Sequence, residues 1–178
     1  MTAVANATFN AADWNTHIRD NLLETEAAKA TSAGKYLVST GANALAARGT
    51  DGTRFFGVES TTSTSYVDLS TVVAVTATTG TKAMVFASAA MHHTTTNAFM
   101  ATSIAVSGAT TVAATDDWMI CTDGVTENAQ LTPDSHNRRG ICHMFTGLNA
   151  GSNTFTMKHR VGSGTGYFHY REIAVLPL

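Results

Sequence analysis

The sequence predicts a mainly β protein, in which an antiparallel jelly-roll or β-sandwich domain follows one N-terminal amphipathic α-helix and an extended connector. From residue 65 onwards, about eight β-rich segments follow one another at intervals of roughly 8 to 14 residues, separated by turn residues. These segments do not alternate with helical patterns, which argues against a parallel α/β fold. Residues 9–24, in contrast, have the periodicity of an amphipathic helix.

The predicted helix has recognisable start signals and one apolar stripe. Asn10 is a suitable N-cap, and Phe9 precedes it at the position that packs onto Trp14 in a hydrophobic staple. Trp14, Ile18 and Leu22 recur every four residues and therefore share one face. We expect the stripe and its flanking residues to form a docking surface, composed of Phe9, Trp14, Ile18, Arg19, Leu22 and Leu23.

A helix of about twenty residues is marginally stable by itself in water, so this apolar stripe needs a covering surface. The stripe can pack on the protein's own sheet, or on other copies and a larger assembly. The second alternative is favoured because the stripe is narrow and a connector follows it.

Three regions are expected along the chain. Residues 1–33 form the anchoring helix, whose propensity fails near Gly34. Residues 34–64 form an extended connector that follows a surface, because apolar residues recur there between glycines. Residues 65–178 form the β domain, and its apolar final segment, residues 173–178, is expected to be held in the sheet or at a subunit interface.

Alternation of apolar and polar residues is clearest in the last β segments. This alternation identifies residues that we expect to lie either in the core or at an interface between three copies of the chain. These candidates are Phe145, Phe155, Tyr167, Tyr170, Ile173, Val175 and Leu178.

Composition excludes several classes of partner. A net charge of −2 provides no basic field for nucleic acid, and the apolar runs are too short to cross a membrane. The first residues lack the features of a signal peptide, so we expect synthesis in a reducing cytosol. Cys121 and Cys142 can form a disulfide, although two buried thiols on separate strands are favoured. Charged residues make up 13% of the chain, which leaves faces suited to burial against copies of the same protein.

No reaction chemistry is evident in the sequence. The sequence contains no nucleophile-elbow, P-loop or dinucleotide-binding motif and no EF-hand or zinc-ligand spacing, so we expect neither an enzyme nor a cofactor. His92 and His93 are possible metal ligands, but adjacent strand residues point to opposite faces, and a shared site would need symmetry copies. Several aromatic residues can line a sugar-binding face, although packing in the core or between subunits is the favoured role. These residues are Trp118, Tyr167, Phe168, Tyr170 and Phe145.

Residues 9–48 carry a specific resemblance. The segment "FNAADWNTHIRDNLLETEAAKATSAGKYLVSTGANALAAR" resembles the N-terminal segment of structural proteins from tailed bacteriophages, particularly phages of actinobacteria. Those proteins share a W-N-x-x-(I/V)-R-D-N-L helix followed by a Gly- and Asn-containing segment. The matching residues are Trp14, Asn15, Ile18, Arg19, Asp20, Asn21 and Leu22, then Gly34, Thr40, Gly41, Asn43 and Ala44.

The resemblance implies a virion protein that assembles in the host cytoplasm. Such chains occur as head-decoration, fibre or minor tail proteins, and their β domain is similar in outline to trimeric jelly rolls of the tumour-necrosis-factor and complement-head type. We therefore expect a homotrimeric capsid decoration or cement protein, or a head fibre, that docks on the major capsid protein or on tail proteins. The alternative is a tail fibre or minor tail protein that binds a glycan on the host surface.

Overall fold

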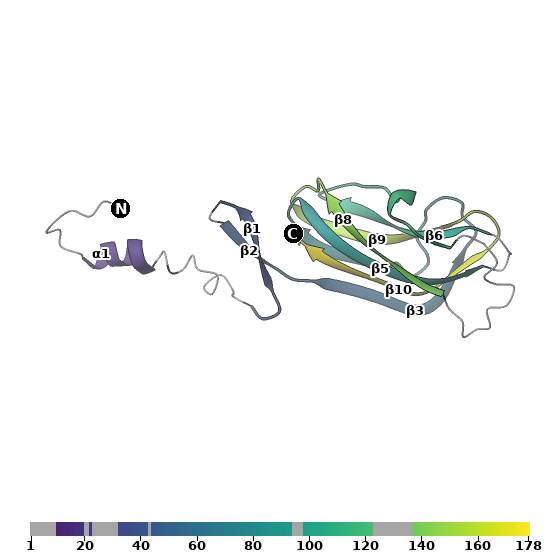
Figure 1. Cartoon of the computed structure of the whole chain (residues 1–178), viewed down its shortest axis with the longest axis horizontal. Helices are drawn as coiled ribbons and strands as arrows, with labels where there is room; N and C mark the ends of the chain where they lie inside the picture. The colour runs from purple at the N-terminus through teal and green to yellow at the C-terminus, as the bar shows by residue number, and fades with distance from the viewer. Residues whose placement is uncertain (1–9, 20–21, 23–31, 43, 94–97, 123–136) are drawn as a thin grey trace. The chain divides into compact units, whose positions relative to one another are not determined.

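A computed structural model describes two compact units, Met1–Gly49 and Thr50–Leu178, which we treat separately (Figure 1). The structure describes residues 10–19, 22, 32–42, 44–93, 98–122 and 137–178. Within these residues, no helix has both the length and the apolar character that crossing a bilayer requires.

The first unit contains a short helical segment and a β-hairpin. Helix α1 (Ala11–Trp14) continues as a π-helical turn at Asn15–Arg19. Asn10 caps α1 as predicted, because its Oδ1 accepts a hydrogen bond from the Ala12 N–H at 2.9 Å. The rest of the predicted long helix falls on residues 20–31, of which only residue 22 is described, so its full length stays a prediction. Strands β1 (Tyr36–Gly41) and β2 (Ala44–Arg48) pair as an antiparallel hairpin.

The second unit is a sandwich of two four-stranded antiparallel sheets. The first sheet has the order β3-β10-β5-β8, formed by Asp51–Thr61, Gly166–Pro177, Lys82–His93 and Asn137–Thr146. The second sheet has the order β4-β9-β6-β7, formed by Ala74–Thr79, Gly151–Val161, Met100–Gly108 and Ile120–Thr122. Each sheet alternates early and late strands of the chain, which is the connectivity of an eight-stranded jelly roll. The predicted antiparallel β-sandwich is confirmed.

Strand β3 lies in the segment that the sequence suggested to be a connector. It pairs along its length with β10 and belongs to the second unit. Gly52 and Gly57 interrupt its apolar pattern, which hid the strand from sequence analysis. The absence of a side chain at Gly57 makes room for the Phe55 ring, because a Cβ built at Gly57 would lie 2.5 Å from that ring.

The core lies between the two sheets and is built from alternating strand residues. Phe155 and Met157 of β9 face Val85 of β5 and Ile173 of β10, and each of the four is at most 1% exposed. Removing such side chains from water is the main stabilising term of the sandwich.

The final strand, β10, is central in the first sheet, between β3 and β5. Beyond it, the Leu178 N–H donates to the Lys82 carbonyl at 2.9 Å, and the Gly80 N–H donates to the Leu178 carbonyl at 2.8 Å. The prediction that residues 173–178 are held in the sheet is confirmed.

The expected burial of both thiols is wrong. Cys121 in β7 is half-buried and Cys142 in β8 is exposed, and the two are not bonded to each other. Alternation along β8 directs His143 and Phe145 inwards, so Cys142 faces outwards.

Candidate functional site

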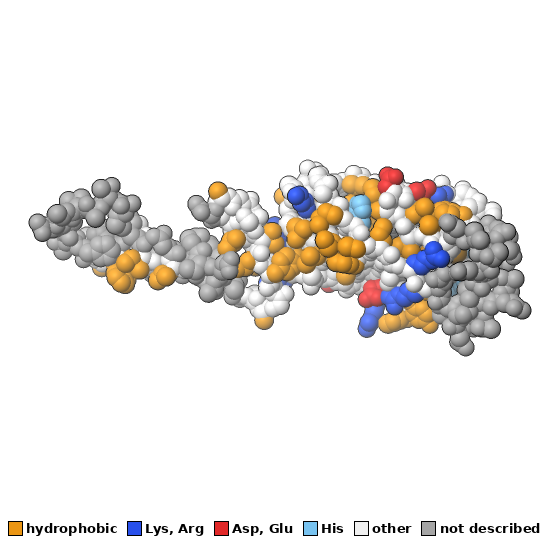
Figure 2. Space-filling view, in the orientation of Figure 1, with side chains coloured by type: hydrophobic (Ala, Val, Ile, Leu, Met, Phe, Trp, Pro, Cys, Tyr) orange, Lys and Arg blue, Asp and Glu red, His pale blue; other side chains and the backbone are white. Residues whose placement is uncertain are grey.

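The two outer faces of the sandwich differ in chemistry. Among the described residues of the second unit, six large hydrophobic side chains are exposed, and five of them lie on the outer face of the first sheet. We call this surface the apolar face and define it by Phe56, Val58, Phe86, Met144 and Tyr170. Figure 2 shows hydrophobic side chains gathered over the strands of this sheet.

Strand register places these side chains in two clusters on the same face, with Arg54, Glu172 and Ser88 in the row between them. Phe86 of β5 lies opposite Ala174 of β10 on one side and Cys142 of β8 on the other. A shallow hollow of about 460 Å³ surrounds Phe86 and is lined by both of these neighbours. At the β3 edge, the rings of Phe56 and Tyr170 meet edge-on with centroids 6.3 Å apart.

The apolar face also carries charged groups, two of which pair with each other. Arg138 and Glu172 form an ion pair at 2.5 Å, and Arg138 also donates to the Ser88 hydroxyl at 2.7 Å. The Arg54 guanidinium lies over the Phe56 ring, 4.8 Å from its centroid. If this face were buried, Arg138 and Glu172 would still neutralise each other, so neither would become an unpaired buried charge.

Two histidines meet at one end of the same sheet. The ring nitrogens His92 Nδ1 and His169 Nε2 are 2.6 Å apart, and Tyr167 stacks on His92 with centroids separated by 4.7 Å. His93 Nε2 lies 2.7 Å from the Ser163 carbonyl oxygen. Within the described part of the chain, no group of three or more potential ligands is positioned to hold a metal ion.

The outer face of the second sheet is polar and contains a groove of about 600 Å³. Threonine hydroxyls cover the neighbouring strands, and those of Thr76 and Thr154 are hydrogen-bonded at 2.8 Å. We call the cavity the polar groove, and its lining includes Tyr66, Ala105, Ala113, Asp116, Lys158 and Arg160.

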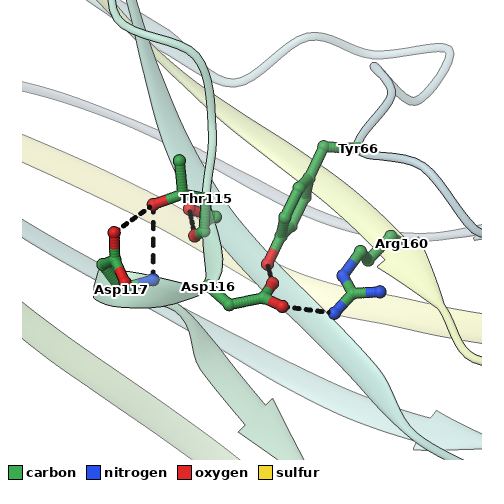
Figure 3. A network of polar contacts seen from close by, with 6 residues as sticks. Tyr66, Thr115, Asp116, Asp117 and Arg160 are labelled. Atoms are coloured by element: carbon green, nitrogen blue, oxygen red, sulfur yellow. Dashed lines mark hydrogen bonds and ion pairs between the residues drawn. The ribbon is translucent and has the colours of Figure 1, made fainter.

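A hydrogen-bonded triad occupies the polar groove (Figure 3). The Tyr66 hydroxyl donates to Asp116 Oδ1 and Arg160 Nη2 donates to Asp116 Oδ2, each at 2.7 Å. Asp116 begins the short 3-10 helix η2 (Asp116–Trp118), where the Thr115 hydroxyl accepts from the Asp117 N–H at 3.3 Å. The Arg160 guanidinium also lies over the rings of Tyr66 and Phe99, so it is held from several sides.

The protonation states within the triad follow from this geometry. Burial, together with the neighbouring carboxylate, raises the pKa of Tyr66 to about 12. The Tyr66 hydrogen bond and the Arg160 charge lower the pKa of Asp116. At neutral pH, the groove therefore presents a protonated phenol beside an ionised carboxylate.

The sequence-predicted docking residues lie in the first unit. Trp14 and Leu22 are 54% and 61% exposed, and Ile18 is half-buried. Phe9 and Leu23 lie outside the described residues, and for Arg19 the structure describes the backbone alone. A docking role for this set stays a prediction.

The candidates for core or trimer contacts separate into two groups. Phe145, Phe155, Ile173 and Val175 are buried in the core. Tyr167 and Leu178 are half-buried, and Tyr170 is exposed on the apolar face.

Sequence analysis missed the other members of the apolar face: Phe56, Val58, Phe86 and Met144. A signal was present in β5, where Met84 and Phe86 alternate with Val85 and Ala87, so both faces of the strand are apolar.

The jelly roll is an architecture shared by viral capsid, lectin and cupin domains, and it does not by itself define a function. No protein-family model matches the chain, and no curated protein matches it. Two solved structures with a similar fold come from infectious bursal disease virus. The VP2 subviral particle is 10% identical with a TM-score of 0.46, covering 78% of this chain and 36% of that chain. The Gt strain structure is 13% identical with a TM-score of 0.38, covering 78% and 35%.

Proposed function

We propose that this chain is a structural subunit of a bacteriophage virion that assembles as a homotrimer through its apolar face. In this proposal it is a capsid decoration or cement protein, or a head fibre. Its N-terminal segment docks on the particle, and its jelly roll projects. The observation that carries the proposal is the exposure of five large hydrophobic side chains on one sheet face.

Exposed clusters of large apolar side chains mark interaction sites in soluble proteins. The large side chains lie on neighbouring strands of one sheet, and the Arg138–Glu172 pair on the same face is already neutralised. Obligate interfaces have this character, because they resemble a domain core cut in half.

The same face carries exposed apolar side chains at one edge and a hollow elsewhere, and we propose another copy of this chain as the occupant. Phe56 and Val58 are 60% and 54% exposed at the β3 edge, whereas the hollow lies around Phe86, between β10 and β8. Two different patches on one chain can make a head-to-tail contact, and such contacts close into a ring where the rotation between copies allows it. A ring of three copies is the closed form that we propose.

The N-terminal residues support the virion part of the proposal. Their sequence resembles the N-terminal segment of phage structural proteins, and the side chains of Trp14 and Leu22 are exposed. A protein that covers a capsid lattice needs a segment that docks on the particle and a domain that associates with other copies, and we propose both for this chain.

Light scattering of the purified chain after size exclusion tests the proposal. We expect the mass of three chains for the wild type and of one chain for Phe86→Glu, because the new carboxylate would be buried without a partner. Ser107→Glu is the matched control, since Ser107 is exposed on β6 of the second sheet, and it should leave the trimer intact. A wild-type monomer at micromolar concentration would overturn the proposal.

A further inference from the structure

We propose that the polar groove of the second sheet is a binding site for a neutral saccharide. This inference goes beyond the assembly role and does not depend on it. The groove belongs to the sheet opposite the apolar face, so burial of the apolar face leaves it accessible.

The size of the polar groove suits a small ligand. Sites for small molecules commonly enclose 300–1,000 Å³, and this groove encloses about 600 Å³.

The triad supplies the two kinds of hydrogen bond that adjacent sugar hydroxyls need. Asp116 is ionised and about half exposed, so its oxygens can accept from one hydroxyl while still holding Tyr66 and Arg160. Arg160 and Lys158 bring N–H donors to the same groove for the neighbouring hydroxyl oxygen. A carboxylate beside a guanidinium thus matches a vicinal diol, in which each hydroxyl both donates and accepts.

The donors are fixed before a ligand arrives. Arg160 is held by Asp116 and by two aromatic rings, and Lys158 is held by Asp68 at 2.6 Å. Fixing these long side chains within the chain reduces the entropy lost on binding.

The charge of the groove favours a neutral ligand over an ionic one. Arg160 is neutralised by Asp116, and Lys158 is neutralised by Asp68. An anion would have to displace one of these carboxylates, and a cation would have to displace a basic side chain.

Small apolar residues complete the match to a sugar ring. Ala105, Ala113 and Ala114 line the groove and present methyl groups with no bulky side chain. A pyranose has one face of C–H groups, which can lie on such a surface while its hydroxyls reach the polar side chains.

Saturation-transfer NMR of the full chain tests the inference with the methyl glycosides of glucose, galactose and mannose as probes. We expect saturation of at least one of them at millimolar concentration. Glucuronate and glucosamine, which carry charge, should bind at least tenfold more weakly.

Two variants and two matched controls locate the binding. Asp116→Asn should weaken binding at least tenfold by removing the charged acceptor, and Asp117→Asn, the neighbouring exposed acid outside the groove lining, should not. Ala113→Phe fills the groove from an exposed position and should abolish binding, whereas Ala150→Phe at another exposed alanine should not. Melting temperatures identify any variant that fails to fold. If Asp116→Asn fails to fold, the result for Ala113→Phe decides the test.

The inference is overturned if none of the three glycosides is saturated, if binding is unchanged in both groove variants, or if the charged sugars bind as well as the neutral ones. Light scattering of the same samples separates this result from the assembly proposal. A monomer that binds sugar refutes the trimer alone, and a trimer that binds none of the probes refutes the sugar site alone.

Discussion

Arg171 of the central strand β10 forms an ion pair with Glu59 of the edge strand β3, with 2.5 Å between Nη2 and Oε2 and a side chain of Arg171 that is 1% exposed. Arg171 Nη1 also donates to the Thr71 carbonyl at 2.9 Å, and the Thr71 N–H donates to Glu59 at the same distance. The guanidinium lies over the Phe55 ring, 4.8 Å from its centroid. One buried cation therefore holds two strands and the segment that follows β3.

Replacing Arg171 should destabilise the sandwich strongly. Arg171→Met removes the partner of Glu59 and leaves a largely buried carboxylate, which costs about 3–5 kcal/mol of unfolding free energy. Urea denaturation measures the loss. Arg138→Met is the control, because it breaks a half-exposed pair with Glu172 and should cost less than about 1 kcal/mol. The double variant Arg171→Met with Glu59→Gln should regain part of the loss, and equal losses for the two arginine variants would contradict this account.

Tyr170 has a left-handed backbone conformation, with φ of 46°, where the pairing of β10 with β3 shifts between His169 and Arg171. A side chain at such a φ is strained by about 1–3 kcal/mol. Tyr170 is also a member of the apolar face, so the strain coincides with the proposed interface.

Tyr170→Gly should therefore be more stable than Tyr170→Ala, and both variants should weaken self-association. We expect Tyr170→Gly to be about 1 kcal/mol more stable in urea than Tyr170→Ala, because both lose the ring but the alanine keeps the strain. In sedimentation velocity, both variants should dissociate at concentrations at least tenfold higher than the wild type does. Equal stability of the two variants would show that the backbone at Tyr170 is not strained.

His159 should make folding stability depend on pH. Burial, reinforced by the positive charges of Arg171 and Lys158, lowers the pKa of His159 well below 6.5. The folded state then keeps the ring neutral, with Nδ1 2.9 Å from the Thr102 hydroxyl, while the unfolded chain binds a proton below pH 6.5. Stability is therefore complete above pH 6.5 and falls as the pH decreases below it, by up to about 1.4 kcal/mol per pH unit.

Urea denaturation between pH 7.5 and 5 measures this dependence. His159→Gln should flatten the profile, because glutamine can bond Thr102 without titrating. His93→Gln, at a half-buried histidine on the end of β5, should leave most of the slope in place. A wild-type profile that is flat over this range would rule out a neutral buried His159.

The β segments near the end of the chain could be predicted because strict alternation fixes their two faces. Phe155 and Met157 alternate with threonine and lysine, and the structure places both side chains in the core as that pattern requires. The strand β3 could not be predicted, because Gly57 is present to admit the Phe55 ring, a contact that no local pattern reveals.

The candidate sites were harder to predict than the fold. In β5, the outward Phe86 and the inward Val85 are both apolar, so periodicity alone cannot say which face is exposed. The polar groove joins Tyr66, Asp116 and Arg160 from three distant parts of the sequence, and only the pairing of strands brings them together.

The exposed apolar side chains of the first unit lead to a last prediction. Trp14→Ala combined with Ile18→Ala should leave the melting temperature of the sandwich unchanged, because these residues lie in the unit that precedes it. The same variant should be missing from purified particles, since the docking segment loses its apolar contacts. Asn15→Ala, on the polar side of the same segment, should be incorporated normally. Normal incorporation of the double variant, measured by quantitative immunoblotting of particles, would mean that this segment does not anchor the protein.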